Sequence, residues 1–259
     1  MTRKIVVTSG KGGVGKTTVA ACLGLKLSTM GKRTVIADVD FGLNNLDILL
    51  DAEDKTSFGL EDVISGKCRI KQALIEINKN LYIIPSSKKA SVNLSSQNLK
   101  LLVEGLAKSY DFVLLDCPAG ISAGFERAVA SVDEALVVVN PSLSSLRDAD
   151  KAISIIKSYG LEKIGVIVNR ARGDLMAQKL TLTPKEITDI LRLPLTGVLP
   201  DDDNLLLGDA RRLPEFKLSD KAYLLTARNL LGVSGKIYDP IKPYKGFFGR
   251  MRAAALRRS

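Results

Sequence analysis

A glycine-rich run near the start of the chain carries the residue types and the spacing that phosphate binding requires. Residues 10–18 read Gly-Lys-Gly-Gly-Val-Gly-Lys-Thr-Thr, so that four residues separate Gly10 from the triplet Gly15-Lys16-Thr17. The backbone N–H groups of such a loop surround phosphate oxygens, and glycine permits the close approach. Lys16 then reaches the terminal phosphates, and the Thr17 hydroxyl ligates Mg²⁺. The run therefore predicts a nucleotide site, because a simple Gly-rich turn explains neither the lysine nor the threonine.

Carboxylates follow two apolar segments further along the chain. Asp38 and Asp40 come after the segment 34–37, and Asp116 comes after the segment 112–115. Alternate residues at a strand end point to the same side, so Asp38 and Asp40 can serve one site. Beside a phosphate loop, such groups hold Mg²⁺ directly or through water, or orient an attacking water. Turn-forming aspartates are the alternative explanation, and the neighbouring phosphate loop favours the chemical one.

The order of apolar runs and helical patterns predicts the scaffold that positions these groups. Near-continuous Val/Ile/Leu runs indicate strands buried on both faces, as in a parallel sheet. Helical patterns between them predict an α/β fold, a doubly wound and mostly parallel sheet flanked by helices. Together with the phosphate loop, this fold is that of a P-loop NTPase. Ligands of such sheets bind at the carboxyl ends of the strands. The expected strands are 5–8, 34–37, 81–84, 112–115, 135–139, 164–168 and 195–199, and the expected helices are 18–30, 96–109, 146–159, 184–191 and 219–231.

Composition excludes several classes of chemistry. The 259 residues contain no histidine, so histidine bases and histidine metal sites are excluded, and any hydrolysis must rely on positioning and electrostatics. Three cysteines at scattered spacings form no paired metal or disulfide motif. The chain has no apolar run long enough to span a membrane and begins without a signal-peptide pattern, which predicts a cytoplasmic location.

The positive charge is concentrated in the last 20 residues. The net charge is +10, and residues 240–259 supply +6 of it without one acidic residue. At 100° per residue, Phe247, Phe248 and Met251 fall in one stripe, with Arg250 and Arg252 outside it. Apolar groups flanked by cations are typical of a helix lying in a membrane interface. A helix packed on the body, or a disordered basic end, is the alternative. We therefore predict an ATPase domain at 1–239 and a basic amphipathic membrane-targeting tail at 240–259.

The second lysine of the loop carries a family resemblance. With Lys11 directly after Gly10, the string resembles the loop of the deviant Walker A ATPases, the MinD/ParA family. The resemblance implies that Lys11 crosses a dimer interface and touches the ATP of the partner subunit. It also implies that Asp38 lies near Mg²⁺ and that Asp40 positions the attacking water. The implied catalytic residues are Lys11, Lys16 and Asp40, and the implied metal-site residues are Thr17, Asp38 and Asp116.

Later segments extend this resemblance. The string Asp-Cys-Pro-Ala-Gly at 116–120 resembles the second switch of the MinD branch, and residues 144–150 resemble a stretch near its dimer face. The local alternative for residues 144–150 is a helix start with a serine cap. Asn169, Pro200 and Asp201 follow strand patterns and match the adenine pocket of relatives, although an ordinary turn also explains each. The implied nucleotide-binding set is Gly10, Lys11, Gly12, Gly13, Val14, Gly15, Lys16, Thr17, Thr18, Asn169, Pro200 and Asp201.

The resemblance covers nearly the whole chain and implies a weak, partner-stimulated, Mg²⁺-dependent ATPase that helps to place the division septum. It implies ATP and Mg²⁺ as cofactors, a homodimer on ATP, and peripheral attachment to anionic lipids at the cytoplasmic face of the inner membrane. The implied protein partners are a MinC-like inhibitor and a MinE-like stimulator. One tail binds weakly, whereas two tails on a dimer gain on the order of 10²–10⁴ in avidity. The alternatives are a ParA-like DNA-partitioning ATPase, which the apolar tail disfavours, and a flagellar-placement relative.

Overall fold

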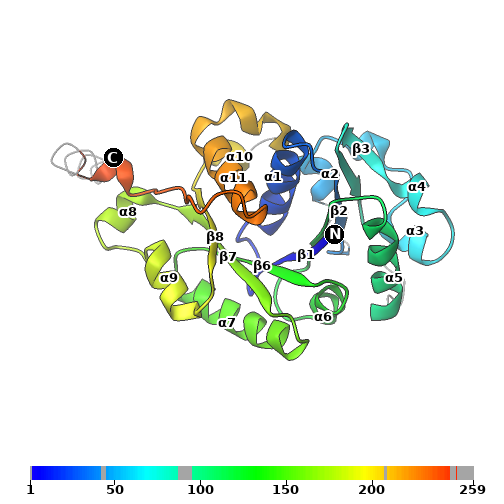
Figure 1. Ribbon diagram of the computed structural model, residues 1–259, viewed down its shortest axis with the longest axis horizontal. Helices are drawn as coiled ribbons and strands as arrows, with labels where there is room; N and C mark the ends of the chain where they lie inside the picture. Colours follow the sequence, from blue (N-terminus) through cyan, green and yellow to red (C-terminus); the bar gives the residue numbers. More distant parts are fainter. Residues whose placement is uncertain (1, 42–44, 87–94, 207–208, 246–248, 250–259) are drawn as a thin grey trace.

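Eight strands form one sheet in the order β3-β4-β2-β5-β1-β6-β7-β8 (Figure 1). The computed structural model describes residues 2–41, 45–86, 95–206, 209–245 and 249. All pairings are parallel except that of β3 with β4. The strands are β1 Arg3–Thr8, β2 Thr34–Asp38, β3 Ile75–Asn78, β4 Leu81–Ile84, β5 Phe112–Asp116, β6 Glu134–Val139, β7 Lys163–Ala171 and β8 Leu195–Pro200.

Helices cover both faces of this sheet (Figure 1). One apolar layer packs α1, α2 and α11 on the sheet, and the other packs α5, α6, α7 and α9 on the opposite face. Neighbouring residues of β1 alternate between the layers, with Ile5 and Val7 in the first and Val6 in the second. The helices are α1 Lys16–Thr29, α2 Leu46–Leu49, α3 Leu60–Ile64, α4 Ile70–Ala73, α5 Ser96–Ala107, α6 Ala123–Val129, α7 Leu143–Ser158, α8 Gly173–Ala177, α9 Pro184–Leu191, α10 Asp203–Leu206 and α11 Lys217–Leu230; 3₁₀ turns lie at η1 Glu53–Lys55, η2 Ala210–Glu215 and η3 Lys242–Tyr244.

The winding of the sheet reverses at β1. The chain runs from β1 outward through β2 to β4, returns to β5 beside β1, and then builds β6, β7 and β8 on the other side. In open α/β sheets, ligands bind at the carboxyl ends of the strands where the order reverses. The glycine-rich run follows β1 directly, so it lies at that position. The predicted fold class, a doubly wound and mostly parallel sheet flanked by helices, is confirmed.

The sequence did not predict one of the strands, β3. The short edge strand β3 pairs antiparallel with β4 through a tight turn. The Asn78 side chain shapes that turn, because its Oδ1 accepts hydrogen bonds from the N–H groups of Asn80 and Leu81, both at 3.0 Å. A four-residue edge strand buries only part of its surface, so it lacks the continuous apolar run that marks the central strands.

Candidate functional site

The glycine-rich loop joins β1 to α1 in the conformation that phosphate binding requires. Gly13 and Gly15 have φ of 75° and 91°, in the left-handed region that favours glycine. Gly10 has a different role, because a Cβ there would lie 2.1 Å from the carbonyl carbon and oxygen of Asp148 on α7. The loop therefore lies directly against the N-terminal half of α7. No side chain larger than hydrogen fits between them.

Lys16 and three carboxyl groups converge beside this loop. Asp38 and Asp116 are register partners on the adjacent strands β2 and β5. The N–H of Asp40 donates to Asp38 Oδ1 at 2.9 Å, and the N–H of Val39 donates to the Asp116 carbonyl at 2.9 Å. The Lys16 side chain is 8% exposed, and its charge acts on both Asp40 and Asp116. The structure therefore brings together the predicted catalytic and metal-site residues of one subunit.

Burial dominates the electrostatics of these carboxyls. It raises the pKa of Asp116 to about 6, although Lys16 and a hydrogen bond from the Thr17 hydroxyl oppose the shift. Burial, with the Asp116 charge as the next cause, raises the pKa of Asp38 well above its ordinary value. Burial also raises the pKa of Asp40, and Lys16 lowers it. Each carboxylate therefore lacks enough neighbouring positive charge to offset its loss of hydration.

The oxygen atoms at this position suit Mg²⁺. Asp116 Oδ1 is buried and has no hydrogen-bond partner among the described residues. A hard divalent cation takes such carboxylate and hydroxyl oxygens, and Mg²⁺ keeps several waters or phosphate oxygens besides. No cluster of three or more His, Cys, Asp or Glu residues suited to a metal occurs in the part of the chain that the structure describes. Asp116, Asp38 and Thr17 would therefore hold Mg²⁺ together with substrate oxygens, since they do not form a complete protein cage.

Two cavities flank the loop. The larger, of about 370 Å³, is the phosphate cavity and includes Lys16, Thr17 and Asp40 in its wall. The smaller, of about 20 Å³, is the base cavity and includes Asn169, Pro200 and Asp201. The structure thus groups the three residues predicted for adenine at one place, although the base cavity has room for little more than a water molecule. Their contact with a base stays a prediction.

Asn169 has a contact that the sequence did not indicate. Its Nδ2 donates to the Val14 carbonyl of the loop at 2.8 Å, and the side chain is 7% exposed. A Cβ at Gly15 would lie 2.5 Å from that same Nδ2. Asn169 therefore braces the loop beside its left-handed glycine. This contact joins residues 155 positions apart, so no local pattern could have predicted it.

Sequence reasoning also missed Arg170 and Ser86. Arg170 lines both the phosphate cavity and the base cavity. The Ser86 hydroxyl donates to Asp38 Oδ2 at 3.3 Å. A cation directly after Asn169 at a strand end was the available signal for Arg170. The predicted trans-acting lysine, Lys11, is exposed on the loop, as a residue that contacts a partner subunit must be.

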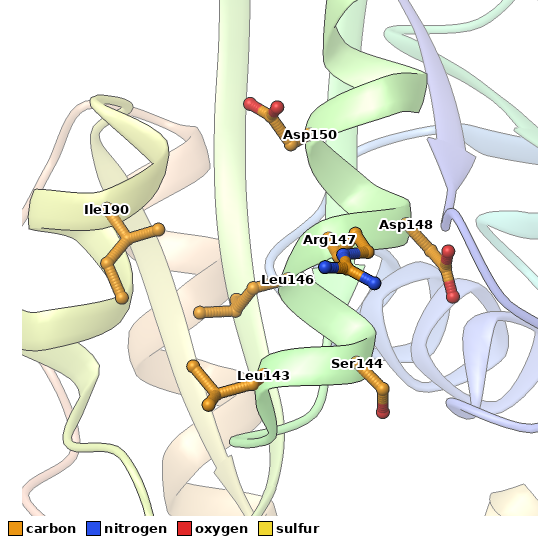
Figure 2. A pocket seen from close by; sticks show the side chains of 7 residues that line it. All are labelled: Leu143, Ser144, Leu146, Arg147, Asp148, Asp150 and Ile190. Carbon is orange, nitrogen blue, oxygen red and sulfur yellow. The ribbon is translucent and has the colours of Figure 1, made fainter.

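Residues 144–150, which resemble a stretch near a dimer face and have a helix start as their local alternative, lie within α7. The expected serine cap within this stretch is wrong: α7 begins earlier, and the Ser142 hydroxyl accepts the Ser145 N–H at 3.3 Å. Leu143 and Leu146 point toward Ile190 of α9 across a cavity of about 810 Å³, whereas Asp148 points to the other side of α7 (Figure 2). The interface role stays a prediction.

The predicted membrane residues Phe247, Phe248, Arg250, Met251 and Arg252 lie outside the described residues. Before them, the 3₁₀ turn η3 packs on α8, where a Cβ at Gly173 would lie 1.8 Å from the Pro240 carbonyl oxygen. The domain boundary at 239/240 stays a prediction. Among the described helices, none combines the length and apolar character of a membrane span.

Comparisons with known proteins agree with this geometry. A family model described as an AAA domain matches residues 2–164. The chain is 39% identical to the septum site-determining protein MinD of Synechocystis, over 99% of both chains. It superposes with a TM-score of 0.83 on a chain of the MinC:MinD cell division protein complex from Aquifex aeolicus, at 36% identity, covering 90% of this chain and 97% of that one.

Another similar structure is a nucleotide complex. The septum site-determining protein MinD of Pyrococcus horikoshii, complexed with Mg-ADP, matches with a TM-score of 0.80 and 32% identity, covering 91% of this chain and 98% of that one. These structures match nearly the entire chain, so the similarity includes the strands, the loop and the carboxyl edge of the sheet.

Proposed function

The chain belongs to the MinD family of septum site-determining P-loop ATPases, and we propose that it is a Mg²⁺-dependent ATPase whose ATP-bound dimer attaches to the membrane. Its full-length similarity to septum site-determining proteins favours division-site selection over a ParA-like role in DNA partitioning. The observation that carries the proposal is the convergence of Lys16, Asp38 and Asp116 beside a loop with two left-handed glycines.

Each residue of the site has a separate role in ATP hydrolysis. Lys16 and the loop N–H groups hold the charge of the phosphates, and Asp40, in the wall of the phosphate cavity, orients the attacking water. Bound Mg²⁺ supplies further neutralisation of phosphate charge. Lys11 of the partner subunit stabilises the charge that develops in the transition state, much as an arginine finger does.

Dimerisation then controls membrane attachment. The exposed position of Lys11 supports a contact that forms only when two loops face each other. Each dimer carries two basic amphipathic tails, and each tail alone binds anionic lipid weakly. Hydrolysis separates the subunits, so both tails release together. We also propose a MinC-like inhibitor and a MinE-like stimulator as partners; the Aquifex relative is a MinC:MinD complex.

Analytical ultracentrifugation tests the ATP-dependent dimer. Asp40→Ala should retain ATP and sediment as a dimer with Mg²⁺ and ATP, but as a monomer with ADP. Lys16→Ala should remain monomeric with either nucleotide, because it cannot hold the phosphates. A D40A protein that sediments identically with ATP and ADP would contradict the proposal.

The ParA-like alternative predicts binding to DNA. Such a protein would bind duplex DNA with ATP through basic groups, and its affinity would fall steeply as salt rises. Most of the net charge of this chain instead lies in residues 240–259, which supply +6 of the total of +10.

A further inference from the structure

Arg170 has a backbone conformation that needs an explanation. Four described non-glycine residues have φ between 47° and 59°: Asp51, Arg170, Lys179 and Arg192. Three of them lie in turns or at a helix end, where this conformation is common. Arg170, with φ of 53°, lies inside strand β7. A bulky residue held in the left-handed region of a strand stores strain, and such strain is concentrated at functional positions.

A bulge in the sheet produces this conformation. Val168 pairs with Val198, but the next pair joins Ala171 to Pro200, so β7 has an extra residue relative to β8. Bulges redirect a side chain out of the regular alternation of a strand. The N–H of Asp201 still reaches the Ala171 carbonyl at 3.4 Å, so the sheet continues beyond the irregularity. The bulge therefore changes the direction of Arg170, and pairing between β7 and β8 continues on both sides of it.

The side chain of Arg170 lies between the two cavities of the nucleotide site. Three residues line both the phosphate cavity and the base cavity: Gly15, Thr18 and Arg170. Among the residues that the structure describes, its guanidinium has no ion-pair or hydrogen-bond partner, although Asp201 and Asp202 line the same base cavity. Arg172, two residues later, is by contrast paired with Asp174 at 2.8 Å. A half-buried cation with no partner among the described residues is available to an anionic group of a bound ligand.

We propose that Arg170 is a nucleotide-binding residue whose guanidinium contacts the α-phosphate of the nucleotide bound in the same subunit. In a nucleotide, the ribose and the α-phosphate lie between the base and the terminal phosphates. Arg170 lies at the corresponding position in the protein, between the base cavity and the phosphate cavity. The planar fork of arginine matches phosphate oxygens in a bidentate contact. This inference rests on the proposed ATPase function, and it adds a contact distinct from those of Lys16 and Lys11.

Paired glycine substitutions test this contact. Arg170→Gly removes the cation and relieves the left-handed strain, while Arg192→Gly does the same at an exposed residue with the same φ of 53° at the end of α9. We expect R170G to raise the Kd for Mg·ADP and for Mg·AMPPNP about equally, roughly 10-fold or more, because both ligands carry an α-phosphate. R192G should stay within about twofold of the unsubstituted protein. Arg170→Lys should recover part of the affinity, since it keeps the charge without the fork.

The thermal melting temperature without nucleotide provides the second readout. If R170G binds poorly yet melts at or above the temperature of the unsubstituted protein, the loss belongs to the contact and not to misfolding. Unchanged affinity in R170G, or a loss confined to AMPPNP, would overturn the inference while leaving the proposed ATPase intact. Failure of the unsubstituted protein to bind either nucleotide would instead overturn the proposed function itself.

Discussion

Asp38 and Asp116 lie side by side as register partners on β2 and β5, and their side chains are almost fully buried. Burial raises the pKa of both carboxyls, and the charge of Asp116 raises that of Asp38 further. Lys16 opposes the shift at Asp116 but does not cancel it. The protein thus maintains a pair of poorly compensated anions at the edge of its sheet. A divalent cation would compensate them, so this arrangement costs stability until the site is loaded.

Replacing Asp116 should therefore stabilise the nucleotide-free protein while abolishing its activity. The folded pKa of about 6 exceeds the ordinary value of 3.8, so the folded state holds a proton that the unfolded state loses. Stability accordingly falls as the pH rises from about 4 to about 6, and the cost above that range is about 3 kcal/mol. Asp116→Asn should recover up to that amount at pH 7 and almost nothing at pH 4, as measured by urea unfolding without Mg²⁺.

The control for this prediction is Asp189→Asn, which changes an exposed carboxylate on α9. Its unfolding free energy should differ from that of the unsubstituted protein by no more than about 0.5 kcal/mol at either pH. The quantity to compare is the unfolding free energy of D116N minus that of the unsubstituted chain. If this difference is smaller at pH 7 than at pH 4, the carboxylate is well compensated in the folded state and the prediction is wrong.

Mixing two inactive variants tests whether Lys11 acts across the dimer. Lys11→Ala lacks the donated lysine, and Asp40→Ala lacks the residue that orients water, so each alone should hydrolyse ATP poorly. In a mixed dimer, the K11A subunit keeps Asp40 and receives Lys11 from its partner, which completes one site. An equal mixture should therefore recover about a quarter of the normal rate, since half of the dimers are mixed and each has one complete site. No recovery would place Lys11 in its own subunit's site.

Gly10 should tolerate no side chain, because it separates the loop from α7. A methyl group there would lie 2.1 Å from the Asp148 carbonyl carbon and oxygen, both of which belong to a rigid helix backbone. We expect Gly10→Ala to lower the unfolding free energy by roughly 1–3 kcal/mol and to displace the loop. Gly12→Ala is the matched control, since its new methyl would meet only the Ala119 Cβ at 3.8 Å. Equal stability of both variants without nucleotide would contradict the packing described for Gly10.

The sequence was sufficient to predict functional groups whose geometry is set within one short segment. A glycine-rich run between a strand and a helix predicts a phosphate loop because each residue serves the same local geometry. Apolar runs ending in Asp38 and Asp116 likewise predicted strands with carboxylates at one edge of a parallel sheet, because the carboxyl ends of such strands meet there. The order of elements then sufficed for the fold class.

Contacts between distant segments were beyond local reasoning. The brace from Asn169 to the Val14 carbonyl depends on how β7 lies beside the loop, and the fit of Gly10 against Asp148 depends on the position of α7. The bulge that redirects Arg170 arises from pairing between β7 and β8. None of these relationships changes the hydrophobic period of its own segment, which is the signal that sequence reasoning uses.

Sedimentation with anionic liposomes tests the central claim, that ATP controls membrane attachment through the tail. The full chain and a truncation after Lys245, which retains the packed η3 turn, should be compared with Mg·ATP and with Mg·ADP. We expect the full chain to pellet with ATP and to remain in the supernatant with ADP, and the truncated chain to remain there with both. Equal pelleting with ATP and ADP, or pelleting that survives the truncation, would contradict the account.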